Sequence, residues 1–339
     1  MPMSTSVTQA AILAAPQAAV GVGPFDPGAP GPGEVLIRME ACGICHSDLM
    51  ISRLPKLPRS PLVLGHEAIG RIVELGAGVN GVATGDRVGI TFLAAGCGQC
   101  DLCRDGRERY CLKQQNTGYT RDGALAGMAV IAVDNLVRIP EGLDPQRVAP
   151  LCCAGWTSYC AVRETGLAPG ALVGIFGLGG LGHLGVQYAR YGGLRVAAVD
   201  VAESKLELAR ELGAEITVAA AGAGRSLMKQ HGGVDAAVVF AAVPEAVDEA
   251  FRAVRRTGTV IVAGLPGRSW EFPLSEAVLK GVAIRGSYLG SREDLVEVFR
   301  LATMGIGLPH VHAHALEETP ALLDRLSAGE VAGRAVVVF

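Results

Sequence analysis

Short runs of apolar residues, separated by turns rich in Gly and Pro, dominate the first part of the chain. Such runs, with polar residues interspersed, are typical of β-strands that are buried on one face. They cover residues 31–44, 66–76, 85–90 and 124–133. We therefore predict a twisted, mostly antiparallel β domain here.

The pattern changes to a helical period through residues 147–166 and then to apolar strands that alternate with helices. Strands too apolar to show alternation, with amphipathic helices between them, are typical of a parallel sheet covered on both faces. This predicts a doubly wound α/β (Rossmann) domain of the nucleotide-binding kind, and we expect the Ala/Gly-rich stretch 219–224 to be a loop. The predicted strands are 171–177, 194–200, 215–220, 233–240, 258–264 and 282–289.

After Leu289 the pattern predicts a helix (291–305), a short strand near 310–316, another helix and a closing strand (333–339). We expect this tail to return to the first domain. A chain of 339 residues is also too long for one comfortable core. We therefore divide it into residues 1–153, 154–286 and 287–339.

Composition narrows the class of protein. Half of the residues are apolar and 46 are Gly, which suits a globular protein, and a net charge of −3 with mixed signs does not favour nucleic acid as a partner. We find neither an unbroken run of eighteen apolar residues nor a basic start before the first apolar stretch. We therefore expect no membrane span, no signal peptide and a cytoplasmic location. Nine cysteines in such a chain indicate metal binding or redox chemistry rather than disulfides.

A glycine-rich turn follows the predicted strand 171–177 and opens a helix. Its residues are Gly177, Leu178, Gly179, Gly180, Leu181 and Gly182. In a dinucleotide fingerprint the first glycine makes the tight turn, the second lets the backbone approach the pyrophosphate, and the third lets the helix pack on the strand. Glycines also occur in ordinary turns, so this run alone does not distinguish a dinucleotide-binding loop from an ordinary turn.

Asp200 ends the next predicted strand, where a carboxylate can bind both adenosine ribose hydroxyls and repel a 2′-phosphate. This favours NAD over NADP, with Lys205 as a second ribose contact. Asp200 as a helix N-cap or loop residue stays open as an alternative.

Four cysteines form a C-x2-C-x2-C-x7-C pattern, at Cys97, Cys100, Cys103 and Cys111. They lie in a loop, about residues 96–112, with little apolar content of its own. Four thiolates at these separations can close a tetrahedron around a zinc ion that stabilises the loop. The spacing fits an iron–sulfur cluster poorly, and free thiols are the other alternative.

A second set of metal-ligating residues is spread along the chain: Cys45, His66 and Cys153. A Cys2His set with a vacant position is one solution for a catalytic zinc. Taken singly, each residue could equally be a buried thiol or a core histidine.

Six ordered motifs make the chain similar to the zinc-containing alcohol dehydrogenases of the medium-chain family, nearest to bacterial and yeast-type members. The resemblance runs from about Val35 to the C-terminus. It implies a mostly β, GroES-like catalytic domain, two zinc ions per chain, and hydride transfer between NAD and a small alcohol or aldehyde. The motifs are CGICHSD (42–48), GHE (65–67), the four cysteines, LCCAG (151–155), GLGGLG (177–182) and GSYLG (286–290).

The resemblance also assigns the catalytic zinc. Cys45, His66 and Cys153 match its ligands, with Cys153 preferred over Cys152 because it immediately precedes the Ala-Gly pair. Glu67 matches a glutamate beside the zinc and is counted with this metal set. Asp48 matches a carboxylate that orients the ligand histidine.

Further residues match contacts to substrate or cofactor in the family. Ser47 matches the hydroxyl that takes the alcohol proton, and His46 a basic group at the pyrophosphate. Thr157 matches a residue near the nicotinamide, and Arg334 an arginine that reaches the pyrophosphate. The implied mechanism is that zinc lowers the pKa of the alcohol, Ser47 relays the proton, and a hydride passes to the nicotinamide.

Two departures from the family pattern concern the proton path and the substrate. Met50 stands where many relatives have the histidine that ends the proton relay, and a thioether cannot carry a proton. The stretch 51–60 is shorter than the yeast-type loop and lacks its pocket tryptophan. We therefore expect primary or secondary alcohols, including bulky or aromatic ones, rather than ethanol in particular.

Some polar and thiol residues are left over. His310, His312 and His314 share one face of a predicted strand and are expected to form a solvated edge, because both zinc sites are already complete. Cys42, Cys152 and Cys160 are expected to be small buried side chains.

Alternatives on the same scaffold are a polyol, threonine or formaldehyde dehydrogenase. A zinc-free quinone reductase is disfavoured by the Cys45, His66 and Cys153 set, and a non-catalytic zinc- and NAD-binding redox sensor is the alternative outside enzymes. The segment 282–289 resembles the family's dimer-forming edge strand, so we expect a homotetramer or a dimer.

Overall fold

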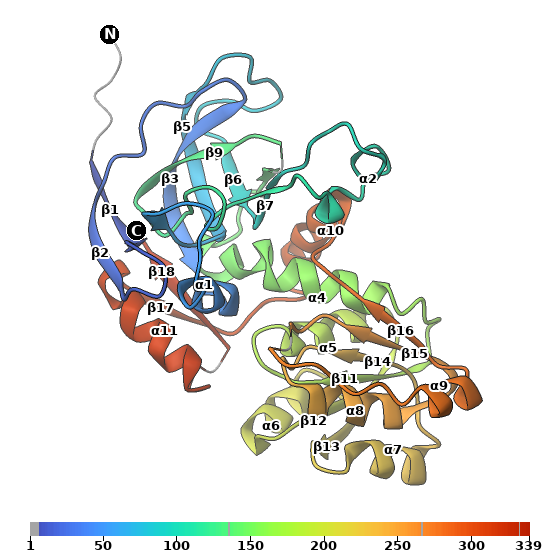
Figure 1. Cartoon of the computed structure of the whole chain (residues 1–339). Coiled ribbons are helices and arrows are strands. Elements are labelled where there is room, and N and C mark those ends of the chain that lie inside the picture. Colours follow the sequence, from blue (N-terminus) through green and yellow to red (C-terminus); the bar gives the residue numbers. More distant parts are fainter. Residues whose placement is uncertain (1–6, 135, 266, 332) are drawn as a thin grey trace. The chain divides into compact units, whose positions relative to one another are not determined.

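The computed structural model describes residues 7–134, 136–265, 267–331 and 333–339 (Figure 1). The chain divides into two compact units. The first runs up to Cys153 and takes up the chain again at Ser291–Thr303 and Leu308–Phe339. The second comprises Ala154–Gly290 and Met304–Gly307. The sequence-based division ended this second domain at residue 286.

The first unit is built mainly from β-strands. A seven-stranded sheet has the order β10-β6-β5-β3-β18-β17, and β9 also pairs with β3. A three-stranded sheet has the order β2-β1-β4, and β7 and β8 form a short ribbon. The strands are β1 (Thr8–Leu13), β2 (Val20–Phe25), β3 (Glu34–Gly43), β4 (Leu62–Val63), β5 (Glu67–Leu75), β6 (Arg87–Ile90), β7 (Leu93–Ala95), β8 (Gln115–Asn116), β9 (Met128–Ala132), β10 (Val137–Arg138), β17 (Val311–His314) and β18 (Arg334–Val338).

Short helices connect these strands. Pro145 begins α3, where its missing N–H costs nothing, and Asp144 caps that helix by accepting a hydrogen bond from the backbone N–H of Gln146. The helices of this unit are α1 (His46–Ser52), α2 (Asp101–Arg104), α3 (Pro145–Val148), α10 (Arg292–Thr303) and α11 (Thr319–Ser327), with 3-10 turns η1 (Glu108–Tyr110), η2 (Ala149–Cys152) and η3 (Leu316–Glu318).

The second unit contains one parallel sheet with the strand order β13-β12-β11-β14-β15-β16. Its order reverses between β11 and β14, which makes the carboxyl ends of these strands the expected place for a ligand. The strands are β11 (Leu172–Phe176), β12 (Arg195–Asp200), β13 (Ile216–Ala219), β14 (Val234–Val239), β15 (Val254–Val262) and β16 (Ala283–Gly286).

Helices cover both faces of this sheet (Figure 1). One core cluster joins the strands to α4 (Ala154–Arg163), α5 (Gly182–Tyr191) and α6 (Glu203–Glu211). The other joins them to α7 (Ala223–His231) and α8 (Pro244–Ala253), and α9 (Leu274–Lys280) follows β15 in the chain. The predicted fold class, a doubly wound parallel sheet plus a mostly β domain, is confirmed.

Three local features differ from the sequence-based expectation. The helix expected over 147–166 is interrupted at Cys153, whose backbone leaves the helical region (φ −134°, ψ −65°) between η2 and α4. Within the stretch 219–224 only residues 220–222 form a loop, because Ala219 ends β13 and α7 begins at Ala223, where Gly224 lets α7 approach the backbone of α8 closely. The hairpin β1–β2 was not predicted, since its six-residue first strand, TQAAIL, shows no regular alternation of apolar and polar residues.

Candidate catalytic centre, cysteine lobe and cofactor loop

Four potential metal ligands converge in the first unit. The ligand atoms of Cys45, His66, Glu67 and Cys153 all lie within 4.8 Å of one another. Cys45 precedes α1, His66 and Glu67 stand at the start of β5, and Cys153 follows η2. All four side chains are buried, and the antiparallel pair β3–β5, in which Gly43 faces Glu67, brings the first three together.

The imidazole of His66 is held from two sides. Its Nδ1 lies 3.3 Å from Oδ1 of Asp48, and its ring meets the edge of Phe92 at a centroid distance of 5.0 Å. Asp48 is itself fully buried and accepts hydrogen bonds from the backbone N–H groups of Cys45 (2.9 Å) and Gly65 (3.1 Å). Both ring nitrogens are buried without a hydrogen-bond partner among the described residues, and Nε2, which does not face Asp48, is the one available to a metal.

A buried ion pair adjoins the four ligands. The guanidinium of Arg334 donates a hydrogen bond to Oε2 of Glu67 and another, of 3.1 Å, to the carbonyl of Ile44. A side chain at position 43 would collide with Oε2 of Glu67, so this pairing needs Gly43. The second carboxylate oxygen, Oε1, is buried and has no partner among the described residues.

The four groups perturb each other's protonation. A hydrogen bond from Cys153 and the nearby charges of His66 and Arg334 hold the pKa of Cys45 well below its usual range, despite burial. The same hydrogen bond, with burial, raises the pKa of Cys153. Burial acts to lower the pKa of His66, but Asp48 and Cys45 outweigh it and the pKa rises. Burial raises the pKa of Glu67 to about 8, against the opposing effect of Arg334.

This donor set fits zinc. Two thiols and an imidazole are a known ligand set for a catalytic zinc with one open position. The ring nitrogens of His66, which are buried without a hydrogen-bond partner among the described residues, support this fit.

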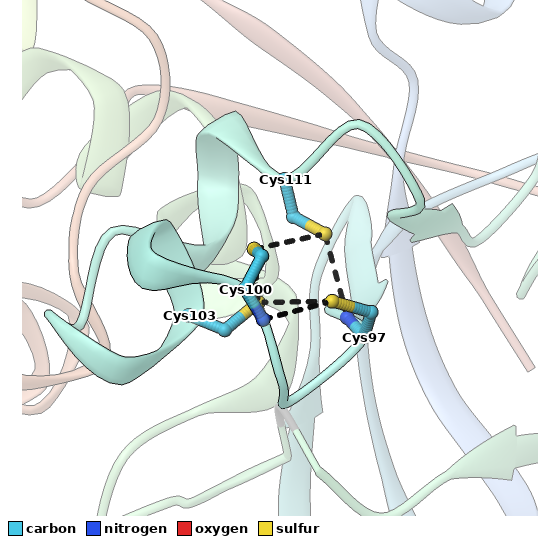
Figure 2. Close-up of side chains that lie close together, drawn as sticks. All are labelled: Cys97, Cys100, Cys103 and Cys111. Atoms are coloured by element: carbon cyan, nitrogen blue, oxygen red, sulfur yellow. Dashed lines mark hydrogen bonds between the residues drawn. The ribbon is translucent and has the colours of Figure 1, made fainter.

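The four remaining candidate ligands lie together in the lobe between β7 and β8 (Figure 2). The sulfur of Cys103 is 3.5 Å from that of Cys100 and 4.0 Å from that of Cys97, and the sulfurs of Cys100 and Cys111 are 3.9 Å apart. The edge of a tetrahedron with zinc–sulfur bonds of about 2.3 Å is roughly 3.8 Å. These separations fit a four-thiolate zinc and are far too long for disulfides.

Backbone N–H groups support the sulfurs of this lobe. Cys97 and Lys113 each donate to the sulfur of Cys111, and Cys100 donates to that of Cys97, all at 3.4 Å. Backbone hydrogen bonds from Gln99 and Cys100 lower the pKa of Cys97 to about 6. A side chain at Gly96 would lie 2.8 Å from the sulfur of Cys103, so the turn into the lobe requires glycine.

In the second unit, the glycine-rich turn has a steric reason for two of its glycines. Gly177 has a φ of +90°, and a side chain there would lie 2.7 Å from the backbone nitrogen of Ala241. A side chain at Gly182, the first residue of α5, would collide with the carbonyl oxygen of Gly177. At Gly179 nothing lies within 4 Å of such a side chain, so the loop is open at the position where a pyrophosphate would approach.

Asp200 faces this turn from the end of β12. Its carboxylate accepts hydrogen bonds from the backbone N–H groups of Leu178 (2.7 Å) and Ala202 (3.0 Å), and the amine of Lys205 lies 3.9 Å away. Asp200 therefore links the glycine-rich turn to the start of α6. It does not cap α6 as an N-cap residue, because Ala202 occupies that position.

The comparisons with known proteins agree with this geometry. Residues 31–141 match the family described as alcohol dehydrogenase GroES-like domain, and residues 180–304 the family described as zinc-binding dehydrogenase. An alcohol dehydrogenase of Geobacillus stearothermophilus is 41% identical over 309 residues, which cover 90% of this chain and 91% of the relative. The chain belongs to the zinc-dependent alcohol dehydrogenase family. It is an enzyme of this type, and the predicted resemblance is confirmed.

Solved structures of other alcohol dehydrogenases have the same fold. That from the archaeon Aeropyrum pernix is 34% identical, with a TM-score of 0.90 over 98% of this chain and 100% of that one. Acetophenone reductase from Geotrichum candidum in complex with NAD is 28% identical, with a TM-score of 0.88 over 100% and 99%. A zinc-binding dehydrogenase from Sinorhizobium meliloti bound to NADP is 27% identical, with a TM-score of 0.88 over 98% and 100%. A nicotinamide cofactor is thus supported for this dehydrogenase.

The other residues predicted for this dehydrogenase lie in ordinary elements. His46 is exposed and Ser47 half-buried at the first two positions of α1, directly after Cys45. Thr157 is buried in α4 of the second unit. Their roles toward substrate and cofactor stay predictions.

Sequence reasoning missed three supports of the catalytic centre. It named Arg334 only as a cofactor contact and did not pair it with Glu67, because 267 residues separate them in the chain. It did not find Phe92, which carries no signal beyond being apolar. Gly43 lies within the CGIC motif, whose glycine was the available signal.

Proposed function

We propose that this dehydrogenase oxidises primary or secondary alcohols to aldehydes or ketones and catalyses the reverse reduction. The reaction takes place at a zinc held by Cys45, His66 and Cys153, with NAD as cofactor. The observation that carries the proposal is the burial of these three ligand-type side chains within 4.8 Å of one another, beside an imidazole held by Asp48. When bound, the zinc supplies a Lewis acid for the substrate oxygen, and NAD supplies the hydride acceptor.

The protein's own residues orient these groups. The carboxylate of Asp48, 3.3 Å from Nδ1 of His66, orients the imidazole and makes it more basic, so that Nε2 would be the ligand atom. Arg334 donates a hydrogen bond to Glu67, which holds its carboxylate beside the three proposed ligands and compensates its charge. Ser47 takes the alcohol proton and passes it to water, since Met50 cannot carry it further.

A second zinc, held by the four lobe cysteines, has a structural role in this proposal. All four positions of its tetrahedron are filled by thiolates, so none is open to a substrate. Few buried apolar residues lie between Gly96 and Gln114, so the ion stabilises the lobe in place of a core.

NAD is preferred over NADP because Asp200 stands at the end of β12 with a buried carboxylate. A carboxylate there repels the 2′-phosphate of NADP and accepts hydrogen bonds from ribose hydroxyls. Replacement by a neutral residue, Asp200→Ser, is expected to lower the ratio of kcat/KM with NAD to kcat/KM with NADP at least tenfold. An unchanged ratio of kcat/KM for the two cofactors contradicts this role of Asp200.

The substrate class rests on the shortened stretch 51–60 and on the structural relatives. One of these is a reductase of acetophenone and another is a cinnamyl alcohol dehydrogenase of Sorghum bicolor, 26% identical with a TM-score of 0.88, and both names denote aromatic substrates. We therefore place aromatic alcohols and ketones ahead of ethanol.

We also propose a cytoplasmic homotetramer or dimer. Strand β16 lies at the edge of the parallel sheet with all four residues exposed, and α9 before it exposes Val278 and Leu279. Among the described residues the structure contains no helix long and apolar enough to cross a membrane.

The decisive experiment combines a zinc count with a steady-state screen. The panel contains aliphatic and aromatic alcohols, polyols, threonine and formaldehyde, each with NAD and with NADP. Two zinc ions per chain and NADH formation from simple alcohols are expected. Turnover confined to polyols, threonine or formaldehyde would identify the enzyme as a dehydrogenase of that substrate. No turnover by zinc-replete protein would favour a redox sensor.

A further inference from the structure

Two exposed histidines lie side by side at the edge of the seven-stranded sheet, away from both cysteine centres in the sequence. Strand β17 is the last strand of that sheet. His310 directly precedes it and His312 is its second residue, so both side chains project on the same side. Their ring centroids are 5.0 Å apart with an interplanar angle of 75°.

This separation is compatible with two imidazoles that share a metal ion. With metal–nitrogen bonds of about 2.0 Å, two ring centroids lie roughly 4.5 Å apart when the bonds make a right angle and about 5.2 Å apart in a tetrahedron. The observed 5.0 Å lies between these limits. Both rings are exposed, so each can turn about its χ2 angle to aim a nitrogen at a common point without displacing core residues.

The backbone that carries the pair is already in place. The carbonyl of His310 accepts a hydrogen bond of 2.8 Å from the backbone N–H of Arg334, and His312 faces Ala335 in the parallel pair β17–β18. A side chain at position 333 would collide with the carbonyl of His310, so Gly333 permits this close approach. The pair therefore loses little backbone freedom on binding a ligand.

His314, two residues further along the strand, is engaged elsewhere. Its Nδ1 lies 3.0 Å from Oε2 of Glu318, which also accepts a hydrogen bond from the backbone N–H of Ala315 through its other oxygen. His314 is therefore a control for the pair rather than a third ligand.

We propose that His310 and His312 form a third metal site, which takes an exchangeable ion of the nickel, copper or zinc type. Imidazole nitrogen suits these ions. In the described part of the chain, clusters of three or more closely spaced Cys, His, Asp or Glu ligands occur only at the two cysteine centres, so water completes the coordination at this pair. Two neutral nitrogens and water bind more weakly than thiolate sets, which makes the site exchangeable and not part of the permanent zinc content.

The test titrates nickel into untagged enzyme whose two cysteine centres are already filled with zinc. Equilibrium dialysis near pH 7.5 is expected to detect one nickel ion per chain above the zinc. His310→Gln and His312→Gln should each weaken nickel binding more than about tenfold, because either change destroys the chelate. The double variant should bind no more weakly than either single variant, and kcat and the zinc count should stay unchanged in all three.

Two matched controls carry the same substitution at other histidines. His231→Gln removes an exposed histidine at the end of α7, and His314→Gln removes the next histidine on β17. Both are expected to bind nickel like the unmodified enzyme. Unchanged binding after His310→Gln or His312→Gln, or equal weakening after His314→Gln, overturns the assignment.

Discussion

The two cysteine centres of the first unit are assembled in opposite ways. In the lobe, all four sulfurs come from the stretch between Cys97 and Cys111, and backbone N–H groups are their main support. In the catalytic centre, the ligands come from three segments between Cys45 and Cys153, and buried side chains support them.

The difference indicates, for each centre, whether the local fold depends on metal binding or metal binding depends on the fold. The lobe has little core, so we expect its fold to depend on the proposed metal. The catalytic centre lies on the β3–β5 pair within the main core, so we expect metal binding there to depend on the fold. Loss of a ligand should therefore abolish turnover at one centre and lower stability at the other.

The sharpest test of this comparison uses two adjacent cysteines. Cys153→Ala removes a proposed ligand of the catalytic zinc. Because such a zinc contributes several kcal/mol to the transition state, turnover should fall more than about 10³-fold. Cys152→Ala is the matched control, because the Cys152 thiol is equally buried but donates only to the carbonyl of Ala68. Steady-state kinetics and the zinc count check both, and an equal loss in the two variants contradicts the ligand assignment.

A smaller effect is expected at the support of His66. Asp48→Asn keeps the shape but loses the charge that orients the imidazole, so kcat/KM or zinc affinity should fall about 10- to 100-fold. Asp86→Asn is the control, since Asp86 also accepts a backbone hydrogen bond from three residues earlier but lies on an exposed turn. If both variants lose activity alike, the role of Asp48 is general stability and not orientation.

The proton path should respond by a few-fold. Met50 is 38% exposed on α1, so a histidine there reaches water. Met50→His should speed alcohol oxidation below neutral pH by roughly two- to fivefold, as a general base restored to the relay. The measurement is the pH profile of kcat/KM for Met50→His, with Met50→Leu as the control. If the profile of Met50→His equals that of the parent enzyme, the hypothesis that the proton relay is shortened at Met50 is wrong.

The smallest effect on turnover belongs to the lobe. Cys103→Ser should remove one zinc ion per chain and leave the turnover of fresh enzyme within about twofold, because the lobe ligands are not those of the catalytic centre. The melting temperature should fall by roughly 5 °C or more, as expected when a structural metal is lost. Zinc analysis and thermal unfolding check this, and an immediate loss of turnover without loss of stability would contradict the comparison.

The same contrast explains how far sequence reasoning reaches. The clustering of the four lobe cysteines could be predicted from spacing alone, because they are close in the chain. The parallel sheet could also be predicted, since apolar strands alternate with amphipathic helices over residues 171–289. Both signals are local.

The catalytic centre could not be predicted from spacing, because Cys45, His66 and Cys153 are joined by sheet pairing and by the break at Cys153. Only the resemblance grouped them. Neither residue spacing nor the family resemblance predicted the pair Glu67–Arg334. This pair depends on β18, at the end of the chain, lying beside β3. The alternation of side chains along a strand predicts that His310 and His312 share a face. It does not predict their close ring contact, which depends on side-chain conformation.

The ion pair between Glu67 and Arg334 also has a consequence for the order of synthesis. A ribosome adds about 5 to 20 residues per second, so synthesis from Glu67 to Arg334, a separation of 267 positions, takes roughly 13 to 53 seconds. During that time β3 and β5 can pair, but the carboxylate that they would bury has no counter-charge. The catalytic centre can therefore close only when the last strand of the chain arrives, so an incomplete chain holds the ligands without the finished site.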